Sequence, residues 1–275
     1  MPATFVVVPQ WQGSGSSRAL RLSDGAEAIR GDLPSASTRT VAVPLEAGDE
    51  LGSGLARLGS LQLVRERTLA ALAEVDDWAL VVGGDCGVSL AGVEHAMGAH
   101  DDLAVVWFDA HPDLNTIESS PSGAFSGMVL RTLLGDGVDA LVPSTPLAPD
   151  RLVLAGARSV DDGEDAYLET SGIARVGVDA LDTPDGLVAA VAATGAASVY
   201  LHIDLDVLDP AEIDGVAEPV PFGLSAAALV GAIRALRASN TVVGATIAGF
   251  SPASADAAND DLPTILRIIG ALTSR

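Results

Sequence analysis

The fold of this chain can be worked out from one stretch, Trp107-Phe108-Asp109-Ala110-His111-Pro112-Asp113-Leu114-Asn115. The four residues before it, at positions 103–106, are Leu, Ala, Val and Val, an apolar run typical of a buried strand. Asp109, His111 and Asp113 occupy every second position, so an extended backbone would aim all three side chains to the same side. The stretch therefore predicts a buried strand that ends in three potential metal ligands.

Two interpretations of these polar residues remain open at this point. Carboxylates held close together repel each other unless a cation neutralises them, and oxygen ligands with one imidazole suit a divalent metal such as manganese. Alternatively, the stretch is a polar loop between a strand and a helix, in which Asp113 or Asn115 caps the helix. Short acidic loops are common, so this stretch alone does not decide between the two.

A second strand with the same kind of ending favours the metal site. Residues 200–210 read Tyr-Leu-His-Ile-Asp-Leu-Asp-Val-Leu-Asp-Pro, and they place carboxylates at Asp204 and Asp206. Because the carboxyl ends of parallel strands meet at one edge of a sheet, the two strands would bring five potential ligands together. Five ligands suit two metals, and two metals that share carboxylates activate water for hydrolysis. His202 lies on the same strand face, where we expect a buried, hydrogen-bonded histidine rather than a ligand.

Strands and helices alternate along the rest of the chain. Eight segments have the character of strands, and they are 4–8, 41–45, 78–82, 103–109, 151–155, 173–178, 198–204 and 241–250. Helical periodicity lies between most of them, at 54–75, 89–97, 127–134, 184–194, 225–238 and 263–272. This alternation predicts a three-layer α/β/α fold with a mostly parallel sheet of about eight strands.

The organisation along the chain is expected to be simple. No internal repeat or long linker divides the sequence, so residues 1–275 are predicted to form one domain. The region 9–38 is rich in Gly, Ser and charged residues and shows no clear periodicity. We expect it to be a surface excursion.

Composition and charge exclude several classes of function. Hydrophobic residues make up 48% of the 275 residues and charged residues 19%, as in globular chains, and no run approaches the roughly 20 apolar residues of a membrane span. The N-terminus lacks the basic and apolar regions of a signal peptide. A net charge of −22 argues against nucleic acid and anionic membranes as partners. The single cysteine, Cys86, cannot form an internal disulfide, which favours a cytoplasmic location.

A third motif completes a recognisable set. Gly83-Gly84-Asp85-Cys86-Gly87 follows an apolar run and leads into a helix. With the two acidic strand endings after it, this motif resembles the ureohydrolase (arginase–agmatinase) family, whose signatures are Gly-Gly-Asp-His, Asp-Ala-His-x-Asp and Asp-x-Asp-x-x-Asp-Pro in that order. The resemblance runs from about residue 79 to residue 252, and the combination is highly specific. It implies a three-layer α/β fold and a hydrolase that uses two Mn²⁺ ions to cleave a guanidinium group.

The resemblance also implies individual roles for the acidic residues. Asp109 and Asp204 match the family's bridging carboxylates. His111 and Asp206 match the remaining ligands of one metal, and Asp113 matches a ligand of the other. Asp113 would also orient the attacking water and handle its proton, which makes it the expected catalytic residue.

Three positions depart from the family pattern. Cys86 stands in place of a metal-binding histidine. Because a soft thiol is poorly matched to manganese, that metal position would be weakened if Cys86 is a ligand. Alternatively, Cys86 is a small buried residue without a ligand role. Ser126 replaces a histidine thought to carry protons to the leaving amine. Gly249 replaces the glutamate that would pair with the guanidinium.

The positions that recognise an amino acid in arginases look retained. The segment 156–164, Gly-Ala-Arg-Ser-Val-Asp-Asp-Gly-Glu, is similar to the family's Gly-x-Arg-Asp-x-Asp-x-Gly-Glu. The resemblance implies that Asn115 and Ser122 bind the substrate's α-carboxylate while Asp161 and Glu164 face its α-amino group. Each residue alone has a turn or capping role as an alternative, but their joint spacing favours an α-amino acid substrate.

An N-hydroxyguanidine substrate would tolerate the three departures. It is less basic than a guanidine, so a pairing carboxylate matters less, and Gly249 would leave room for its extra oxygen. Within the family the chain is therefore most similar to the hydroxyarginase of D-cycloserine (antibiotic) biosynthesis, which converts Nω-hydroxy-L-arginine to hydroxyurea and L-ornithine. Glu218 is either a displaced carboxylate for the guanidine end or a solvent-facing loop charge.

Other interpretations of the same residues remain. The chain could be a divergent arginase or an agmatinase-type enzyme, or a non-catalytic relative that binds a metal and an amino acid. A single-metal amide hydrolase resembling histone deacetylases is a further alternative, against which the Asp206-Val207-Leu208-Asp209-Pro210 run speaks. Trimers and hexamers are familiar among relatives, but the sequence carries no interface signature, so a homo-oligomer is one alternative and the oligomeric state stays open.

Overall fold

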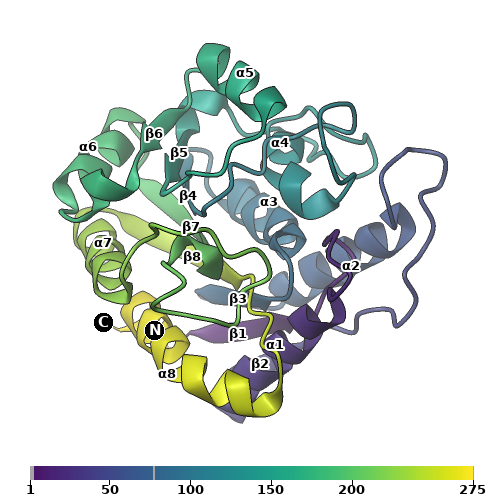
Figure 1. Cartoon of the computed structure of the whole chain (residues 1–275). Helices are drawn as coiled ribbons and strands as arrows, with labels where there is room; N and C mark the ends of the chain where they lie inside the picture. The colour runs from purple at the N-terminus through teal and green to yellow at the C-terminus, as the bar shows by residue number, and fades with distance from the viewer. Residues whose placement is uncertain (1–2, 77, 275) are drawn as a thin grey trace.

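The computed structural model describes residues 3–76 and 78–274, and in this part of the chain it contains an eight-stranded sheet (Figure 1). The strands are β1 (Thr4–Val8), β2 (Thr38–Thr40), β3 (Ala79–Gly83), β4 (Leu103–Phe108), β5 (Leu152–Ala155), β6 (Ala174–Val176), β7 (Ser198–Asp204) and β8 (Thr241–Ala248). Their order in the sheet is β2-β1-β3-β8-β7-β4-β5-β6, and every neighbouring pair is parallel. The predicted α/β fold with a parallel sheet is confirmed.

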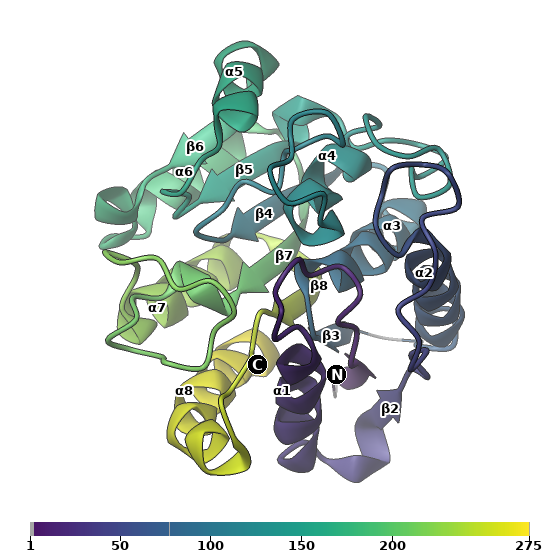
Figure 2. The ribbon, with the colours of Figure 1, turned by 45° about the vertical axis from the view of Figure 1, so that its right-hand side comes forward.

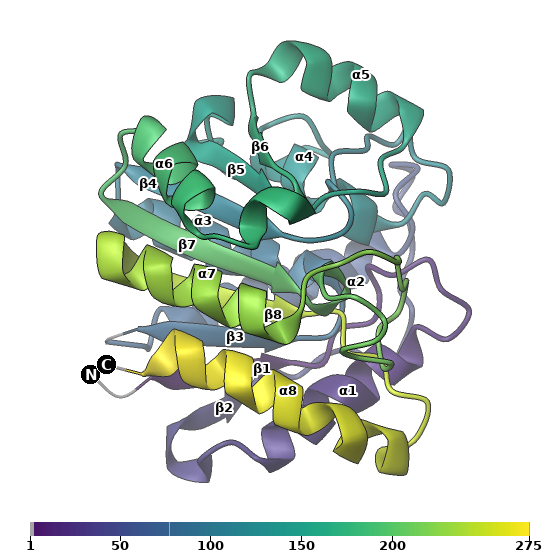
Figure 3. The same ribbon diagram turned by 60° about the vertical axis from the view of Figure 1, so that its left-hand side comes forward.

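Helices cover both faces of this sheet (Figures 2 and 3). One face carries α1 (Leu20–Gly31), α6 (Asp185–Ala193), α7 (Ala226–Ser239) and α8 (Ala255–Thr273). The other face carries α2 (Leu58–Leu72), α3 (Ser89–Ala99) and α4 (Val129–Leu133), and α5 (Asp162–Ser171) adds Leu168 to the core on that side. The result is a three-layer arrangement with a hydrophobic core on each side of the sheet.

Strand β4 shows why its sequence is apolar throughout. Val106 and Phe108 belong to the core on one face, whereas Val105 and Trp107 belong to the core on the other. All six residues of the strand are buried. Successive side chains of a strand point to opposite faces, so a strand covered on both sides needs apolar residues at every position. This is the physical reason that the stretch before Asp109 identifies the fold.

Two predictions for the N-terminal region are wrong. The strand expected at 41–45 lies at Thr38–Thr40, and the expected surface excursion at 9–38 contains helix α1. Leu22, Ala26 and Ile29 of α1 are buried at helical spacing, but three apolar positions among polar neighbours give a weak sequence signal. Gly25 has a packing role, because a Cβ there would lie 2.1 Å from the carbonyl oxygen of Phe250.

Two further helices differ from expectation. Helix α5 was not predicted at all, and α8 begins at Ala255 rather than near residue 263. The Ser254 hydroxyl accepts a hydrogen bond from the backbone N–H of Ala257 at 3.2 Å and so caps α8. Pro263 lies inside α8, which explains why the sequence suggested a start there. Within the described residues, none of the helices combines the length and apolar character that crossing a membrane requires.

The sheet order determines where a site can form. Strands β3, β8, β7 and β4 are consecutive in the middle of the sheet. The acidic and glycine-rich motifs follow β3, β4 and β7, and Gly249 follows β8. Since the strands are parallel, all four carboxyl ends meet at one edge, which is where α/β proteins bind ligands.

Candidate metal centre and amino-acid pocket

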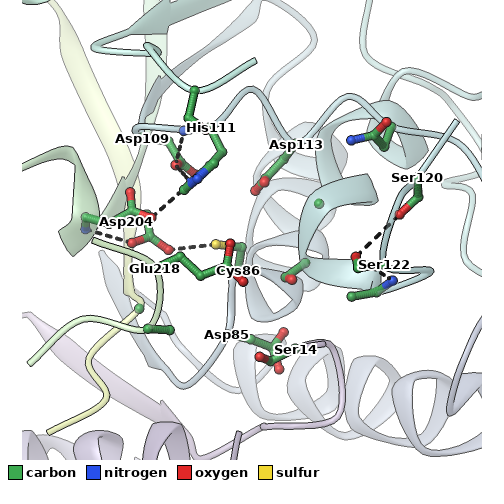
Figure 4. Close-up of a pocket in the computed structure, with 18 of the residues that line it drawn as sticks. Ser14, Asp85, Cys86, Asp109, His111, Asp113, Ser120, Ser122, Asp204 and Glu218 are labelled. Atoms are coloured by element: carbon green, nitrogen blue, oxygen red, sulfur yellow. Dashed lines mark hydrogen bonds and ion pairs between the residues drawn. The ribbon is translucent and has the colours of Figure 1, made fainter. Parts of the chain in front are cut away.

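A cavity opens at the carboxyl ends of the four central strands (Figure 4). It is lined by every residue that the sequence predicts to bind metal or substrate, which are Cys86, Asp109, His111, Asp113, Asn115, Ser122, Asp161, Glu164, Asp204, Asp206 and Glu218. The metal-end carboxylates are buried, whereas Ser122, Asp161 and Glu218 are exposed at the rim. The cavity therefore has a deep acidic end and an accessible polar end. Which of these residues bind metal or substrate stays a prediction.

The segment after β4 is not the extended continuation that the alternating pattern suggested. Strand β4 ends at Phe108, and Asp113 adopts the left-handed conformation, with φ of 53°. Non-glycine residues rarely adopt this conformation, and it changes the direction of the chain there. The His111 backbone N–H donates to Asp109 Oδ1 at 2.7 Å, which tightens the same turn. A turn, and not a strand, thus brings the three side chains to the cavity.

Two groups of side chains are close enough to hold a cation. One contains Asp109, His111 and Asp206, and the other contains Cys86, Asp109, Asp113 and His202, with ligand atoms within 4.8 Å of one another in each group. Asp109 belongs to both groups. The described chain therefore offers two adjacent candidate metal sites that share one carboxylate.

Asp109 is the best stabilised charge in the cluster. The Trp107 indole N–H donates to its Oδ2 at 3.1 Å. Burial raises the pKa of Asp109, but its interactions with the imidazoles of His111 and His202 outweigh burial and hold that pKa well below its usual range. Asp109 is therefore a carboxylate, the form that a metal requires.

The other carboxylates are held together at an electrostatic cost. Burial, with the charge of Asp109 added, raises the pKa of Asp113, Asp204 and Asp206, and the pKa of Asp206 reaches about 6. Asp113 Oδ2 is buried and has no hydrogen-bond partner among the described residues. This buried oxygen therefore lacks a hydrogen-bond donor and lies in a group of like charges. The cluster thus has the chemistry of a cation site.

His111 is the positive group on the cavity side of this cluster. Its Nδ1 lies 3.0 Å from Asp206 Oδ2 and 3.5 Å from Asp109 Oδ1. Burial lowers the pKa of His111, but hydrogen bonds and attraction from Asp109 and Asp206 outweigh burial and raise it to about 12. The imidazole has to lose a proton before it can bind a metal.

Cys86 and Asp204 interact directly with each other. The Cys86 thiol donates to Asp204 Oδ2 at 2.8 Å, and the Asp206 backbone N–H donates to Asp204 Oδ1 at 2.9 Å. Burial raises the pKa of the thiol, and neighbouring carboxylates raise it further. Asp204, the expected bridging carboxylate, lies outside both candidate groups. Cys86 belongs to one group, so both interpretations of this residue stay open.

His202 is buried and hydrogen-bonded, as we expected of a histidine on this strand face. Its ring stacks on Trp107 with the centroids 3.5 Å apart, and Nδ1 lies 2.7 Å from Ser89 Oγ. Its Nε2 lies 3.7 Å from Asp109 Oδ2. His202 does not line the cavity, so it supports Asp109 from behind.

The polar end of the cavity joins two segments that are distant in the sequence. Asn115 Nδ2 donates to Asp161 Oδ2 at 2.8 Å, and Ser122 accepts from the backbone N–H of Ala124 at 3.2 Å. Glu164 accepts from the backbone N–H groups of Leu114 and Asp161, each at 2.9 Å. Both Glu164 oxygens are therefore engaged in fixing the acidic loop to the first turn of α5, a structural task that the sequence did not reveal.

Asp85 is a residue whose importance the sequence analysis missed. It is buried and accepts hydrogen bonds at 2.9 Å from Gln10 Nε2 and from the backbone N–H groups of Gly13 and Gly87. Burial raises the pKa of Asp85 to about 6, although these hydrogen bonds oppose the shift. A Cβ at Gly13 would lie 2.1 Å from Asp85 Oδ1. Asp85 thus holds the loop that contributes Ser14 to the cavity wall. Gly13, directly before Ser14, was the sequence feature that could have indicated this close packing.

Arg158, in the segment 156–164, is a second residue with a structural role that the sequence analysis did not identify. Its guanidinium donates to backbone carbonyls of three segments, among them Asp206 at 2.8 Å, Val220 at 2.7 Å and Gly156 at 3.2 Å. Burial lowers the pKa of Arg158, which nearby carboxylates oppose. The segment at 217–222, which carries Glu218, is therefore tied to the ligand segment after β7.

Gly249 has a packing role that the sequence did not reveal. Its φ is 86°, and a Cβ at this position would lie 2.2 Å from Asp204 Oδ1. The Asp204 carboxylate thus fills the space that a side chain at this position would enter, while Gly249 itself lines the cavity. That the glycine leaves room for a substrate oxygen stays a prediction. Ser126 also lines the cavity, and its backbone N–H donates to the Gly13 carbonyl at 2.9 Å.

Similarity to known proteins agrees with this geometry. The sequence profile of the arginase family matches residues 24–269. The chain is 37% identical to an arginase of Bacillus subtilis over 155 residues, which span 53% of this chain and 52% of that enzyme. It is 34% identical to an arginase of Bacillus caldovelox over 200 residues, which span 66% and 67% of the two chains. Sequence similarity thus covers about half to two thirds of these relatives.

Structural similarity extends over the whole fold. A crystal structure of the Bacillus subtilis arginase superposes with a TM-score of 0.86 and 26% identity, and covers 100% of this chain and 99% of that one. Because the family profile matches most of the sequence and the fold agrees along its length, the chain belongs to the arginase family.

Proposed function

We propose that this protein is a metal-dependent ureohydrolase that cleaves the guanidine group of an α-amino acid. One observation carries the proposal, namely that a single cavity joins a buried carboxylate cluster to a polar end where buried Asn115 meets exposed Asp161. In such a cavity one end of a substrate would reach the metal-dependent hydrolytic site while its other end would reach the amino-acid binding site. The proposal treats residues 1–275 as one domain, since both cores pack on the same sheet.

The residues of the deep end fit two Mn²⁺ ions. Carboxylate oxygens with one imidazole are the ligands that manganese accepts. Asp109, His111 and Asp206 would hold one ion, and Asp109, Asp113 and Asp204 would hold the other, with Cys86 beside it. When bound, manganese supplies the Lewis acidity that polarises a guanidine and makes water a better nucleophile near neutral pH.

The chain's own residues would bind the substrate and move its protons. Asn115 and Ser122 would bind the α-carboxylate, and Asp161, with Glu164 behind it, would face the α-amino group. Water forms a bond to the guanidine carbon, the carbon–nitrogen bond to the side chain breaks, and the leaving nitrogen takes a proton. Asp113, whose Oδ2 has no partner in the described chain, is placed to orient the water and accept its proton.

The proposed substrate is Nω-hydroxy-L-arginine, which would give hydroxyurea and L-ornithine as part of D-cycloserine biosynthesis. The support comes from residues at the reactive end, where Cys86 and Ser126 replace histidines and Gly249 replaces a glutamate. A less basic hydroxyguanidine needs these groups less. L-Arginine is the second candidate substrate, because the relatives reported above are arginases.

Turnover of the two substrates by manganese-loaded protein tests the proposal. Both assays measure the ornithine released, and bound metal is determined in the same samples. We expect kcat/KM to be higher for the hydroxylated substrate. A preference for L-arginine would make the protein a divergent arginase. Bound metal without turnover of any guanidine would identify a non-catalytic relative and overturn the proposal.

Removing the metal should destabilise the protein, and more strongly at higher pH. In the metal-free protein the folded-state pKa of Asp206 is raised to about 6, so Asp206 binds its proton more tightly in the folded protein than in the unfolded chain. The free energy of unfolding therefore falls as pH rises from about 4 to 6. Metal binding also requires that His111 lose a proton. Saturating Mn²⁺ should therefore raise Tm by roughly 5–10 °C at pH 8 and by less at pH 5.5. Differential scanning calorimetry at both pH values measures this, and an equal shift at both would contradict it.

Glu218 should contribute to the guanidine end only modestly, because it is exposed at the rim of the cavity. Glu218→Gln is expected to raise KM about 3- to 10-fold, since an exposed ion pair contributes roughly 1 kcal/mol. Glu169→Gln, an exposed glutamate on α5, is the matched control. Steady-state kinetics measure both, and unchanged kinetics of Glu218→Gln would make this residue a solvent-facing loop charge.

A further inference from the structure

A relay of hydrogen bonds runs through the polar end of the cavity. The backbone N–H of Thr116 donates to Ser119 Oγ at 2.9 Å. The Ser119 hydroxyl donates to Asn115 Oδ1 at 2.8 Å. Asn115 Nδ2 then donates to Asp161 Oδ2 at 2.8 Å. Four groups from the loop after β4 and the start of α5 are therefore linked in one direction.

The chemistry at the two ends of the relay fixes its direction. A backbone N–H can only donate, so the Ser119 oxygen must accept from Thr116 and direct its own hydrogen elsewhere. A carboxylate can only accept, so Asp161 requires the amide nitrogen of Asn115 on its side. The amide oxygen of Asn115 must then face Ser119. The orientation of this amide is thus determined by its neighbours.

One hydrogen of the Asn115 amide is left over. Nδ2 carries two hydrogens, and one of them is used on Asp161. Asn115 is 4% exposed and lines the cavity, and its backbone N–H donates to the Gly127 carbonyl at 3.0 Å, which fixes the residue in place. The remaining N–H is a donor for an acceptor group of the ligand, such as a carboxylate. With the amide reversed, an oxygen would face that carboxylate and repel it.

Helix α5 packs closely against Ser119. A Cβ at Gly163 would lie 2.5 Å from the Cβ of Ser119 and 3.7 Å from Asn115 Oδ1. The glycine in the first turn of α5 therefore lets the helix approach the relay, which brings Asp161 within reach of Asn115. Ser119 is consequently held between the turn at Thr116 and the helix, where its hydroxyl has little freedom.

We propose that Ser119 is a positioning residue that selects α-amino acids with a free carboxylate by fixing the amide of Asn115 as a donor. This inference rests on the proposed function, because it concerns how the amino-acid end of that substrate is recognised. Ser119 acts through Asn115 and need not touch the substrate. Its loss should weaken binding of the amino-acid end and leave the bond-breaking step unchanged.

Ser119→Ala tests the proposal with two readouts. Calorimetry of L-ornithine binding to the manganese-loaded protein should show a Kd that is about 3- to 10-fold higher, as expected when the amide loses one of the two hydrogen bonds that hold it. KM of the amino-acid substrate should rise by the same factor while kcat and manganese content stay within twofold. Ser171→Ala is the matched control, because this hydroxyl also accepts a backbone N–H, from Ile173, at the other end of α5.

The outcomes separate this inference from the proposed function. If wild-type protein neither binds L-ornithine nor turns over an amino-acid guanidine, the proposed function fails, and the inference fails with it. If wild-type protein does either, unchanged Kd and KM in Ser119→Ala would overturn the inference alone. A fall in kcat or in bound manganese would also overturn it, because that result would mean that Ser119 merely supports the loop.

Discussion

Replacing Asp113 by asparagine is expected to lower kcat by about 10²- to 10⁴-fold, the range that a positioned proton acceptor contributes. The substitution keeps the shape of the side chain and removes its charge. Asp113 is buried, its Oδ2 has no partner in the described chain, and it lies in one of the two groups that could hold a cation. Steady-state kinetics of the manganese-loaded variant, with bound metal determined, measure the loss.

The control for this experiment is Asp165→Asn, which makes the same chemical change on the exposed side of α5. Its kinetics should equal those of the wild type. If Asp113→Asn kept its metal and retained kcat within tenfold, Asp113 would have no part in proton transfer. If the variant lost one metal equivalent with its activity, the residue would act mainly as a ligand.

A side chain at position 249 is expected to abolish activity rather than restore that of an ordinary arginase. Gly249→Glu restores the family's glutamate, but its Cβ would lie 2.2 Å from Asp204 Oδ1, and a residue with φ of 86° is strained without glycine. We expect kcat/KM for both substrates to fall at least about 100-fold, since moving catalytic groups by about 1 Å can cost that much. Kinetics and manganese content should fall together.

Gly195→Ala separates the two causes of this loss. Gly195 has φ of 72°, and a Cβ there would meet no heavy atom within 4 Å, so this variant has the backbone strain without the collision. It should lower Tm and leave kinetics unchanged. If Gly249→Glu instead gained turnover of L-arginine, the glycine would be the specificity determinant that the sequence alone suggested.

The central strands and the acidic residues after them were predictable from the sequence. Strands β4 and β7 are buried on both faces, so β4 is apolar throughout and β7 is mostly apolar, and the change to Asp109 and Asp204 marks the strand ends clearly. Parallel pairing then places those ends at one edge. Local pattern and sheet geometry agree here, which is why the location of the cavity follows from the sequence.

The remaining features depend on contacts between distant segments. Helix α1 has few apolar residues, and its Gly25 is explained only by the carbonyl of Phe250. Asp85 is recognisable as an anchor only when Gly13 is seen beside it. The contact between Gly249 and Asp204 likewise joins neighbouring strands β8 and β7. No periodicity or motif spacing encodes these pairs, so neither the packing role of Gly249 nor the anchoring role of Asp85 could be predicted from the sequence.

The way in which Arg158 is held has a consequence for how such enzymes can diversify. Within residues 3–76 and 78–274, every hydrogen bond of its guanidinium goes to a main-chain oxygen, those of Gly156, Asp206, Val207, Leu208, Val220 and Pro221. A carbonyl is present whatever side chain its residue carries. Side chains in the segment around Glu218 can therefore be substituted without loosening its attachment to the sheet. New substrate specificities can then evolve there while the backbone of the segment keeps its position.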